Sequence, residues 1–223
     1  MTLDLHNFFK FYDDSNSNHV AAVQWLEDNL PAQFLDDSET DWIGMFRTKP
    51  PTPAVLDVPY FNQVDNYRDA QRTCNSSSCA MCLAFLKPGS IKGDDEYVKK
   101  VFAIGDTTDH SVQTKVLAGY GVKSHFSYNL SFADIDKSLD AGKPVVIGIL
   151  HRGSLSNPTG GHMCVVIGHT PDKKGYYVND PYGSLNDNYT GPVENGKKTI
   201  YTKAVLKYRW CPGGNDGWGR IFN

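Results

Sequence analysis

The apolar positions near the N-terminus are spaced as on one face of a helix. Val23, Leu26 and Leu30 lie three or four residues apart, and Phe34 continues the series. Pro31 falls inside this pattern, where proline removes a helical hydrogen bond. The pattern therefore predicts two short helices in this segment instead of one long helix.

A proline-rich stretch follows this first apolar segment. The sequence TKPPTP at residues 48–53 favours extended polyproline II and acts as a semi-rigid spacer. The segment before it is short for an independent hydrophobic core. We therefore predict a helical appendage over residues 1–47, a linker over 48–53 and the main domain over 54–223.

The main domain has helical periodicity first and strand-like apolar runs afterwards. Helices are predicted over 76–85, 94–103, 111–119 and 131–141, and strands over 144–150, 162–169 and 175–180. The sequence DKKG at 172–175 predicts a hairpin turn between the last two strands. Helices followed by consecutive strands indicate an α+β fold with N-terminal helices packed on a central antiparallel sheet.

Composition and charge exclude several classes of protein. The chain has 40% hydrophobic and 21% charged residues, as ordinary globular proteins do, and a net charge of -3. A nucleic-acid-binding protein would need a basic surface that this balance argues against. The longest aliphatic run, 145–150, is too short for a transmembrane segment, and no secretory signal is visible, so we expect a protein synthesised in the cytoplasm.

The cysteines do not form a disulfide pattern. There are five, an odd number, and three of them lie within nine residues. Such a set is typical of a reducing cytosol, where thiols stay free.

Cys74 is a candidate nucleophile because of its place in the sequence. Small and polar residues follow it and lead into an apolar helical run, which puts Cys74 at a helix start. Unpaired N–H groups and the helix dipole favour a thiolate there, and the thiolate is the nucleophilic form. The alternative is that Cys74 is a small buried apolar residue, as most free cysteines are.

A cysteine nucleophile needs an imidazole as general base. His162 follows the Gly160-Gly161 pair, which is interpreted as a turn at the mouth of a strand. His169 lies seven residues further on, so it faces the other side of the sheet, about 23 Å away at roughly 3.3 Å per residue. His151 ends the preceding strand and is a weaker candidate.

An orienting acid and an oxyanion donor complete the candidate set. Asp180 ends a strand before Pro181, at the end of the predicted hairpin that also carries His162, and Asn179 is the second choice. Gln63 is preferred as the side-chain donor to an oxyanion, together with the Cys74 N–H. Gln71 is only three residues from Cys74 and is disfavoured.

Two other interpretations use different residues. Cys79 and Cys82 form a C-x-x-C motif, but no second pair completes a zinc site, and residues i and i+3 of a helix both face the core. We therefore predict structural thiols and no metal. A catalytically inactive peptide-binding module, with Tyr182, Trp210 and Trp218 lining a groove, is the other alternative.

Four motifs together resemble one known family. LDVPYFNQ at 56–63, TCNSSSCAM at 73–81, GHMCVVIG at 161–168 and NDPYG at 179–183 are similar to the motifs of C39-like cysteine peptidases, which have a papain-like fold. The resemblance covers about residues 55–200 and implies that Gln63 supplies the oxyanion hole, Cys74 is the nucleophile, His162 the base and Asp180 the orienting acid. The family usually has Gly-Pro after the nucleophile, where this chain has Asn75-Ser76.

The resemblance implies hydrolysis of peptide bonds through a thioester acyl-enzyme, without a cofactor. Among the family's substrates we expect peptidoglycan stem or cross-link peptides, as for a phage endolysin acting on the cell wall after release. Processing of a leader peptide or protein is the alternative. Asn157, Gly161, Tyr182 and Trp218 are expected to bind substrate, and the segment 157–161 is expected to flex over the site. We expect a monomer.

Overall fold

The structure is a computed structural model that describes His19, Ala21, Trp25 and residues 55–223. Apart from those first three residues, the predicted appendage at 1–47 and the predicted linker at 48–53 lie outside the described residues. None of the helices in the described segments is long and apolar enough to cross a membrane.

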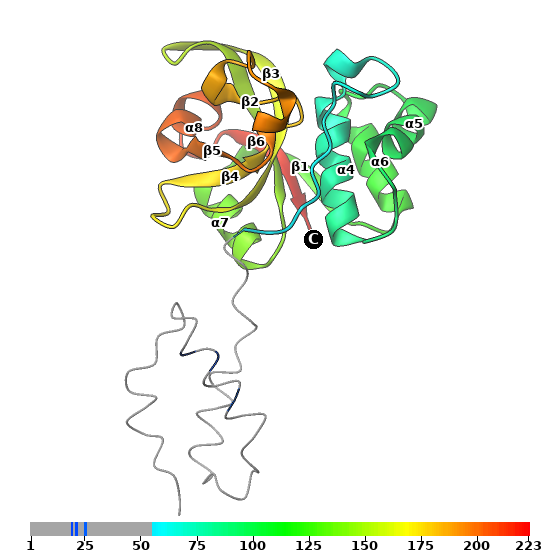
Figure 1. The fold of residues 1–223 in the computed structure, drawn as a ribbon, viewed down its shortest axis with the longest axis horizontal. Helices are drawn as coiled ribbons and strands as arrows, with labels where there is room; N and C mark the ends of the chain where they lie inside the picture. Colours follow the sequence, from blue (N-terminus) through cyan, green and yellow to red (C-terminus); the bar gives the residue numbers. More distant parts are fainter. Residues whose placement is uncertain (1–18, 20, 22–24, 26–54) are drawn as a thin grey trace, which may run out of the picture. The chain divides into compact units, whose positions relative to one another are not determined.

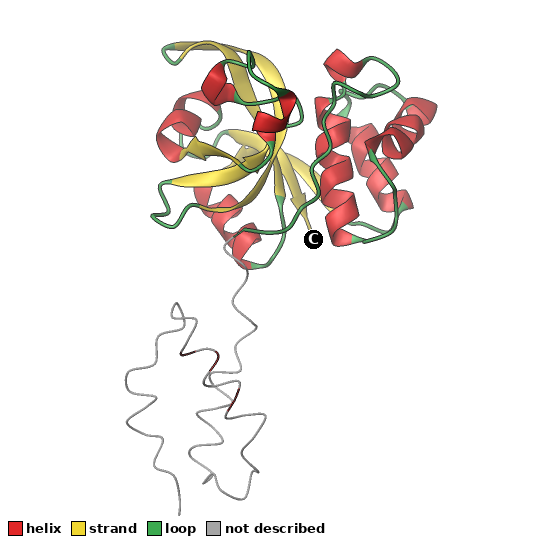
Figure 2. Cartoon of the chain, in the orientation of Figure 1, coloured by secondary structure: helices red, strands yellow, loops and turns green. Residues whose placement is uncertain are grey.

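The first half of the described domain is helical, as predicted. A short 3-10 helix, η2 (Ala70–Arg72), leads directly into α4 (Cys74–Leu86). Then follow α5 (Asp94–Ile104) and α6 (His110–Gly119). Figures 1 and 2 show α4, α5 and α6 together beside the sheet, with α4 nearest to it. α4 is the central element of this layer because every residue from 75 to 83 is buried.

The second half forms one antiparallel six-stranded sheet in the order β1-β6-β2-β3-β4-β5. The strands are β1 (Ser124–Leu130), β2 (Val145–Ser154), β3 (Asn157–His169), β4 (Gly175–Asn179), β5 (Thr199–Thr202) and β6 (Gly217–Phe222). The helices α7 (Phe132–Asp140) and α8 (Lys203–Arg209), and the 3-10 helices η3 (Leu185–Asp187) and η4 (Val193–Gly196), connect them. The predicted α+β class with an antiparallel sheet is confirmed.

The core lies around the two central strands. Residues 145–149 of β2 and 162–168 of β3 are buried without alternation, because both faces of the sheet are covered there. α4 packs against β2 and β3, α7 also contacts both strands, and α8 contacts β2. The continuous apolar runs in the sequence are therefore central strands, with Ile147 and Val165 fully buried.

The β2–β3 hairpin differs from the prediction. Residues 157–161, predicted to be a loop with a glycine turn, are the first part of β3 and pair with residues 150–154 of β2. Gly153 and Gly160 both have a φ of 70°, which glycine adopts without strain, so the hairpin continues through a sequence that looks like a turn. His162 consequently lies inside a long strand instead of at its mouth.

Candidate active site

Cys74 is the first residue of α4, as the sequence predicts. The N–H of Ser77 donates to the Thr73 carbonyl at 2.9 Å, so the N–H groups before it have no partner within the helix. The Cys74 sulfur interacts with the backbone of Asn75 and of Met163, and both interactions favour the thiolate. The helix start therefore surrounds this sulfur with donors.

The serines after Cys74 fix α4 in place, each through a different element. Ser76 shares a 2.6 Å hydrogen bond with the Thr107 hydroxyl, and Ser77 donates to Asp94 at 2.6 Å. Ser78 donates to the Met163 carbonyl of β3 at 3.1 Å. These buried side chains explain how the helix start is held where the family usually has Gly-Pro.

His162 contacts Cys74 on one side and Asp180 on the other. Its Nε2 lies 2.7 Å from Asp180 Oδ1, so Nδ1 is the ring nitrogen left to interact with the Cys74 thiol. The strand register explains the contact between His162 and Asp180. Val165 pairs with Asn179, which puts Asp180 diagonally across from His162 on the same face of the sheet. The sheet thus joins two residues that are 18 positions apart.

Four donors hold the carboxylate of Asp180, which is fully buried. Besides His162, the backbone N–H of Tyr182 donates to Oδ1 at 3.0 Å. The hydroxyls of Tyr201 and Tyr189 donate to Oδ2 at 2.7 and 3.1 Å. No sequence pattern indicates these two tyrosines, because they come from β5 and from a loop without a periodic pattern.

The pKa shifts at the site favour a thiolate–imidazolium pair. Burial opposes the charge on both groups. The hydrogen bond and charge of His162 nevertheless lower the pKa of the Cys74 thiol below its ordinary value. The charge and hydrogen bond of Asp180 raise the pKa of His162 well above the ordinary value of an imidazole. Both shifts favour the nucleophilic form of Cys74.

Three other buried thiols behave in the opposite way. Burial raises the pKa of Cys79, Cys82 and Cys164, and all three are fully buried. Across the described residues, no three His, Cys, Asp or Glu side chains are grouped as metal ligands would be. All five cysteines are free thiols.

Gln63 lines the same pocket as Cys74, and hydrogen bonds to two backbone carbonyls fix its position. Its backbone N–H donates to the Pro181 carbonyl at 2.8 Å, next to Asp180. Its side-chain Nε2 donates to the Ala70 carbonyl at 2.8 Å, which leaves the second N–H of the amide for another acceptor. The side chain is 1% exposed. Gln71, which the sequence analysis disfavoured, lines the same pocket.

The pocket at Cys74 has a volume of about 250 Å³ and contains most of the predicted site residues. It is lined by Gln63, Gln71, Cys74, His151, Arg152, Gly160, Gly161, His162 and Tyr182. Asp180 lies behind His162. Two predicted substrate-binding residues do not line this pocket: Asn157 is at the start of β3, and the Trp218 indole packs on the backbone at Gly148 and Gly161. A Cβ at position 148 would lie 2.1 Å from that indole, so glycine is required there.

His151 is a site residue that the sequence ranked low. Its ring centroid is 5.0 Å from that of His162. Its Nδ1 lies 2.7 Å from the Gly160 carbonyl, and its Nε2 accepts from Arg152 Nε at 3.2 Å, an arrangement that fits the neutral imidazole. Burial, and then the charge of His162, lowers the pKa of His151. A neutral ring therefore lies beside the charged His162.

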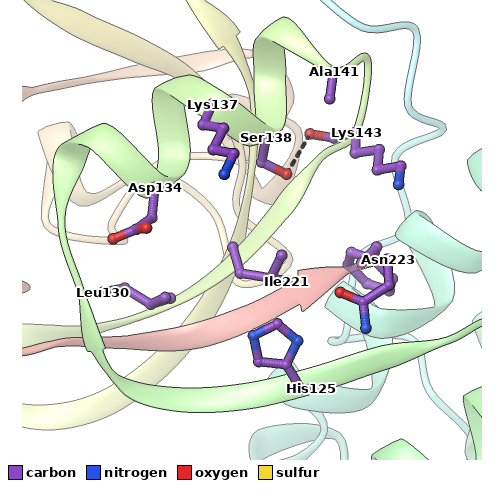
Figure 3. A pocket seen from close by; sticks show the side chains of 10 residues that line it. His125, Leu130, Asp134, Lys137, Ser138, Ala141, Lys143, Ile221 and Asn223 are labelled. Atoms are coloured by element: carbon purple, nitrogen blue, oxygen red, sulfur yellow. Dashed lines mark hydrogen bonds between the residues drawn. The ribbon is translucent and has the colours of Figure 1, made fainter.

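A larger pocket of about 380 Å³ lies elsewhere, between β1, α7 and β6. Figure 3 shows His125, Lys137 and Lys143 among its side chains, and the Ser138 hydroxyl donating to the Lys143 carbonyl at 3.2 Å. Its lining contains no cysteine. The larger volume therefore does not mark the site of nucleophilic chemistry.

Comparison with known proteins identifies the family and proteins of similar fold. The model of the Peptidase_C39 like family matches residues 55–210. A C39-like peptidase from Bacillus anthracis has a similar structure, with a TM-score of 0.52 and 16% identity over 76% of this chain and 96% of that chain. A double-glycine-motif protease from an AMS/PCAT transporter, solved in complex with the leader peptide, has a TM-score of 0.50 and 16% identity over 77% of this chain and 95% of that chain. A search of curated protein sequences found no match. The family model covers more than half of the sequence, and the chain therefore belongs to the Peptidase_C39 like family and is a cysteine peptidase.

Proposed function

We propose that Cys74, His162 and Asp180 hydrolyse a peptide bond through a thioester acyl-enzyme. The observation that supports this most directly is that His162 contacts the Cys74 thiol and, through Nε2, Asp180 Oδ1 at 2.7 Å. The three groups stand in the order of nucleophile, base and orienting acid that a cysteine peptidase needs.

The steps follow from this order. The Cys74 thiolate attacks the carbonyl carbon, and the carbonyl oxygen takes up the negative charge. The amine then leaves with the proton of the His162 imidazolium, which gives a thioester. His162 next removes a proton from water, the hydroxide attacks the thioester, and the Cys74 thiolate is released together with the carboxylic acid product. Asp180 holds the ring orientation throughout.

The oxyanion in this proposal is stabilised by the Cys74 N–H and by Gln63. The Gln63 amide is fixed by the Ala70 carbonyl on one N–H, so the other can donate to the reacting oxygen without reorganisation. Gln71 is close enough to the pocket to be tested beside it.

For the substrate, we propose the stem or cross-link peptides of peptidoglycan, cut after the enzyme synthesised in the cytoplasm reaches the wall. The pocket at Cys74, about 250 Å³, fits a short peptide segment around the scissile bond. Digestion of purified sacculi, with mass analysis of the soluble fragments, tests this assignment. We expect release of peptide fragments by the unaltered chain and none by Cys74→Ala.

Leader-peptide processing is the second candidate. It is supported by the similar fold of the AMS/PCAT transporter protease, which was solved with the leader peptide bound. Peptides containing a double-glycine site distinguish the two functions when they are assayed at the same enzyme concentration as sacculi. Rapid cleavage after the glycines, with intact sacculi, would replace the peptidoglycan assignment.

A further inference from the structure

A second pocket of about 360 Å³ adjoins the one at Cys74. It is lined by His151, Arg152, Gly153, Tyr182, Asn188 and Tyr189. His151, Arg152 and Tyr182 line both pockets, so the two are neighbouring compartments of one groove. The chemistry proposed above uses only the compartment at Cys74.

Arg152 brings a positive charge to the groove and has no acidic partner among residues 55–223. Neither lining contains Asp or Glu. Arg152 is exposed, and its Nε donates to neutral His151; between residues 55 and 223 it forms no ion pair. The Asp180 carboxylate is nearby in the fold, but it is fully buried and occupied by four donors. The Arg152 guanidinium is thus left for an acceptor from outside the described domain.

The backbone that presents Arg152 is held by a second arginine. Arg209 of α8 is buried, and it donates to the carbonyl oxygens of Leu150, Arg152 and Gly153 at 2.6, 3.0 and 2.9 Å. These bonds fix the end of β2 beside the site and add a second positive charge beneath it. A fixed backbone lowers the entropy that Arg152 loses on binding a ligand.

The opposite wall of the groove has an unusual backbone. Asn188 and Tyr189 are consecutive residues with φ values of 55° and 59°, in the left-handed region that a tyrosine seldom adopts. This conformation accompanies the bond of the Tyr189 hydroxyl to Asp180, so the wall of the second pocket is connected to the orienting acid. Such backbone strain is concentrated at functional sites.

We propose that Arg152 makes this enzyme selective for peptides that carry a carboxylate close to the scissile bond. A guanidinium binds a carboxylate through two parallel N–H···O bonds, which fix position as well as supply charge. The inference rests on the proposed function, and it assigns the substrate to the anionic peptides. The carboxylate belongs either to an acidic side chain or to a free α-carboxyl terminus, and the experiment separates these sources.

The first test does not depend on peptide turnover. Iodoacetate and iodoacetamide alkylate a thiolate by the same displacement of iodide, but only iodoacetate carries a negative charge. The ratio of their rate constants at Cys74 therefore reports the electrostatic attraction that the pocket exerts on a carboxylate. We expect Arg152→Gln to lower this ratio at least about fivefold. Lys115→Gln, which removes an exposed charge from α6 outside both pockets, should leave the ratio unchanged.

The second test uses quenched fluorescent peptides in matched pairs. One pair differs by Glu and Gln beside the scissile bond, and the other by a free and an amidated C-terminus. We expect the unaltered chain to prefer the anionic member of at least one pair about tenfold in kcat/KM, and Arg152→Gln to remove the preference. The pair that shows it identifies the source of the carboxylate.

The outcomes separate the inference from the proposed function. If the alkylation ratio of Arg152→Gln stays within twofold of the ratio of the unaltered chain, the proposed role of Arg152 is wrong. Cleavage of both members of each peptide pair at equal rates would also contradict it. If neither these peptides nor sacculi are cleaved, the hydrolase proposal fails, and the alkylation ratio still decides whether the groove binds carboxylates.

Discussion

β3 carries two histidines near carboxylates, His162 in the middle of the strand and His169 at its end, and their surroundings differ in distance and burial. His162 is 2.7 Å from Asp180, and the two side chains are 4% and 0% exposed. His169 is 3.8 Å from Asp136 and 3.8 Å from Asp140, whose side chains are 36% and 78% exposed.

The pKa values of the two histidines are shifted in opposite directions. Burial lowers the pKa of His169, and the two exposed carboxylates do not compensate. Burial also opposes the charge on His162, but the enclosed Asp180 and the Cys74 thiol raise its pKa well above the ordinary value. Proximity of a histidine to an acid is therefore a weak sign of function, whereas a buried, hydrogen-bonded contact with a thiol on the other side is a strong one.

The largest difference between the two histidines is expected when their imidazole rings are removed. His162→Ala should lower kcat/KM at least roughly 1,000-fold, because both proton transfers are lost, and Cys74→Ala should do the same. His169→Ala should remain within about twofold of the unaltered chain. Hydrolysis of a fluorescent peptide, with unfolding temperatures measured alongside, checks this. Equal losses from His162→Ala and His169→Ala would contradict the assignment.

A smaller loss is expected from the oxyanion donor. Gln63→Ala should lower kcat about 100-fold with little change in KM, since the amide contacts an oxygen that becomes charged only during reaction. Gln71→Ala is the matched variant, because both side chains line the pocket. A larger loss in Gln71→Ala than in Gln63→Ala would mean that Gln71, in η2, is the oxyanion donor.

The sequence predicted the elements whose pattern is strong. The central strands β2 and β3 are continuous apolar runs, and α4 to α7 have helical spacing, so their existence follows from local sequence. β6 was not predicted, because it contains Gly217, Gly219 and Arg220 among its six residues. Arg220 is fully buried, and its guanidinium donates to Thr114, Ser124 and the His110 carbonyl. These partners are about a hundred residues away, and no local pattern indicates them.

The same limit applies to the site. Cys74, His162 and Asp180 could be proposed because a helix start, a strand and a strand end each restrict a residue's position. Tyr189 and Tyr201 could not, since their bonds to Asp180 depend on where a loop and an edge strand pack. Arg152 reaches the pocket because β2 and β3 continue as a hairpin through a sequence that looks like a turn.

The charge of Asp180 can be tested separately from its hydrogen bond. In Asp180→Asn the amide oxygen can still accept from His162, so we expect a loss of about tenfold, smaller than that of His162→Ala. Because Asp180 raises the pKa of His162, the variant should lose its imidazolium at lower pH, and the alkaline limb of the kcat/KM profile should move to lower pH. Asp136→Asn, at the His169 end, should leave the profile in place. An alkaline limb that stays fixed in Asp180→Asn would show that His162 is not the group that titrates there.

The smallest expected effect concerns two buried tyrosines, each of which donates to a carboxylate beside one of the two histidines. Tyr201 bonds to Asp180 at 2.7 Å, and Tyr176 bonds to Asp136 at 2.5 Å. Replacing either tyrosine by phenylalanine removes one hydrogen bond to a charged acceptor, and each should lower the free energy of unfolding by about 1.5 kcal/mol.

Only Tyr201→Phe should also change the kinetics. Without that donor the negative charge on Asp180 is less stabilised and attracts the His162 proton more strongly, so the alkaline limb should move slightly to higher pH while kcat falls about twofold. Tyr176→Phe should lose stability and keep its pH profile. If both variants changed only stability, the tyrosine at Asp180 would have a structural role alone, and the difference between the His162 and His169 sites would rest on His162, Cys74 and Asp180.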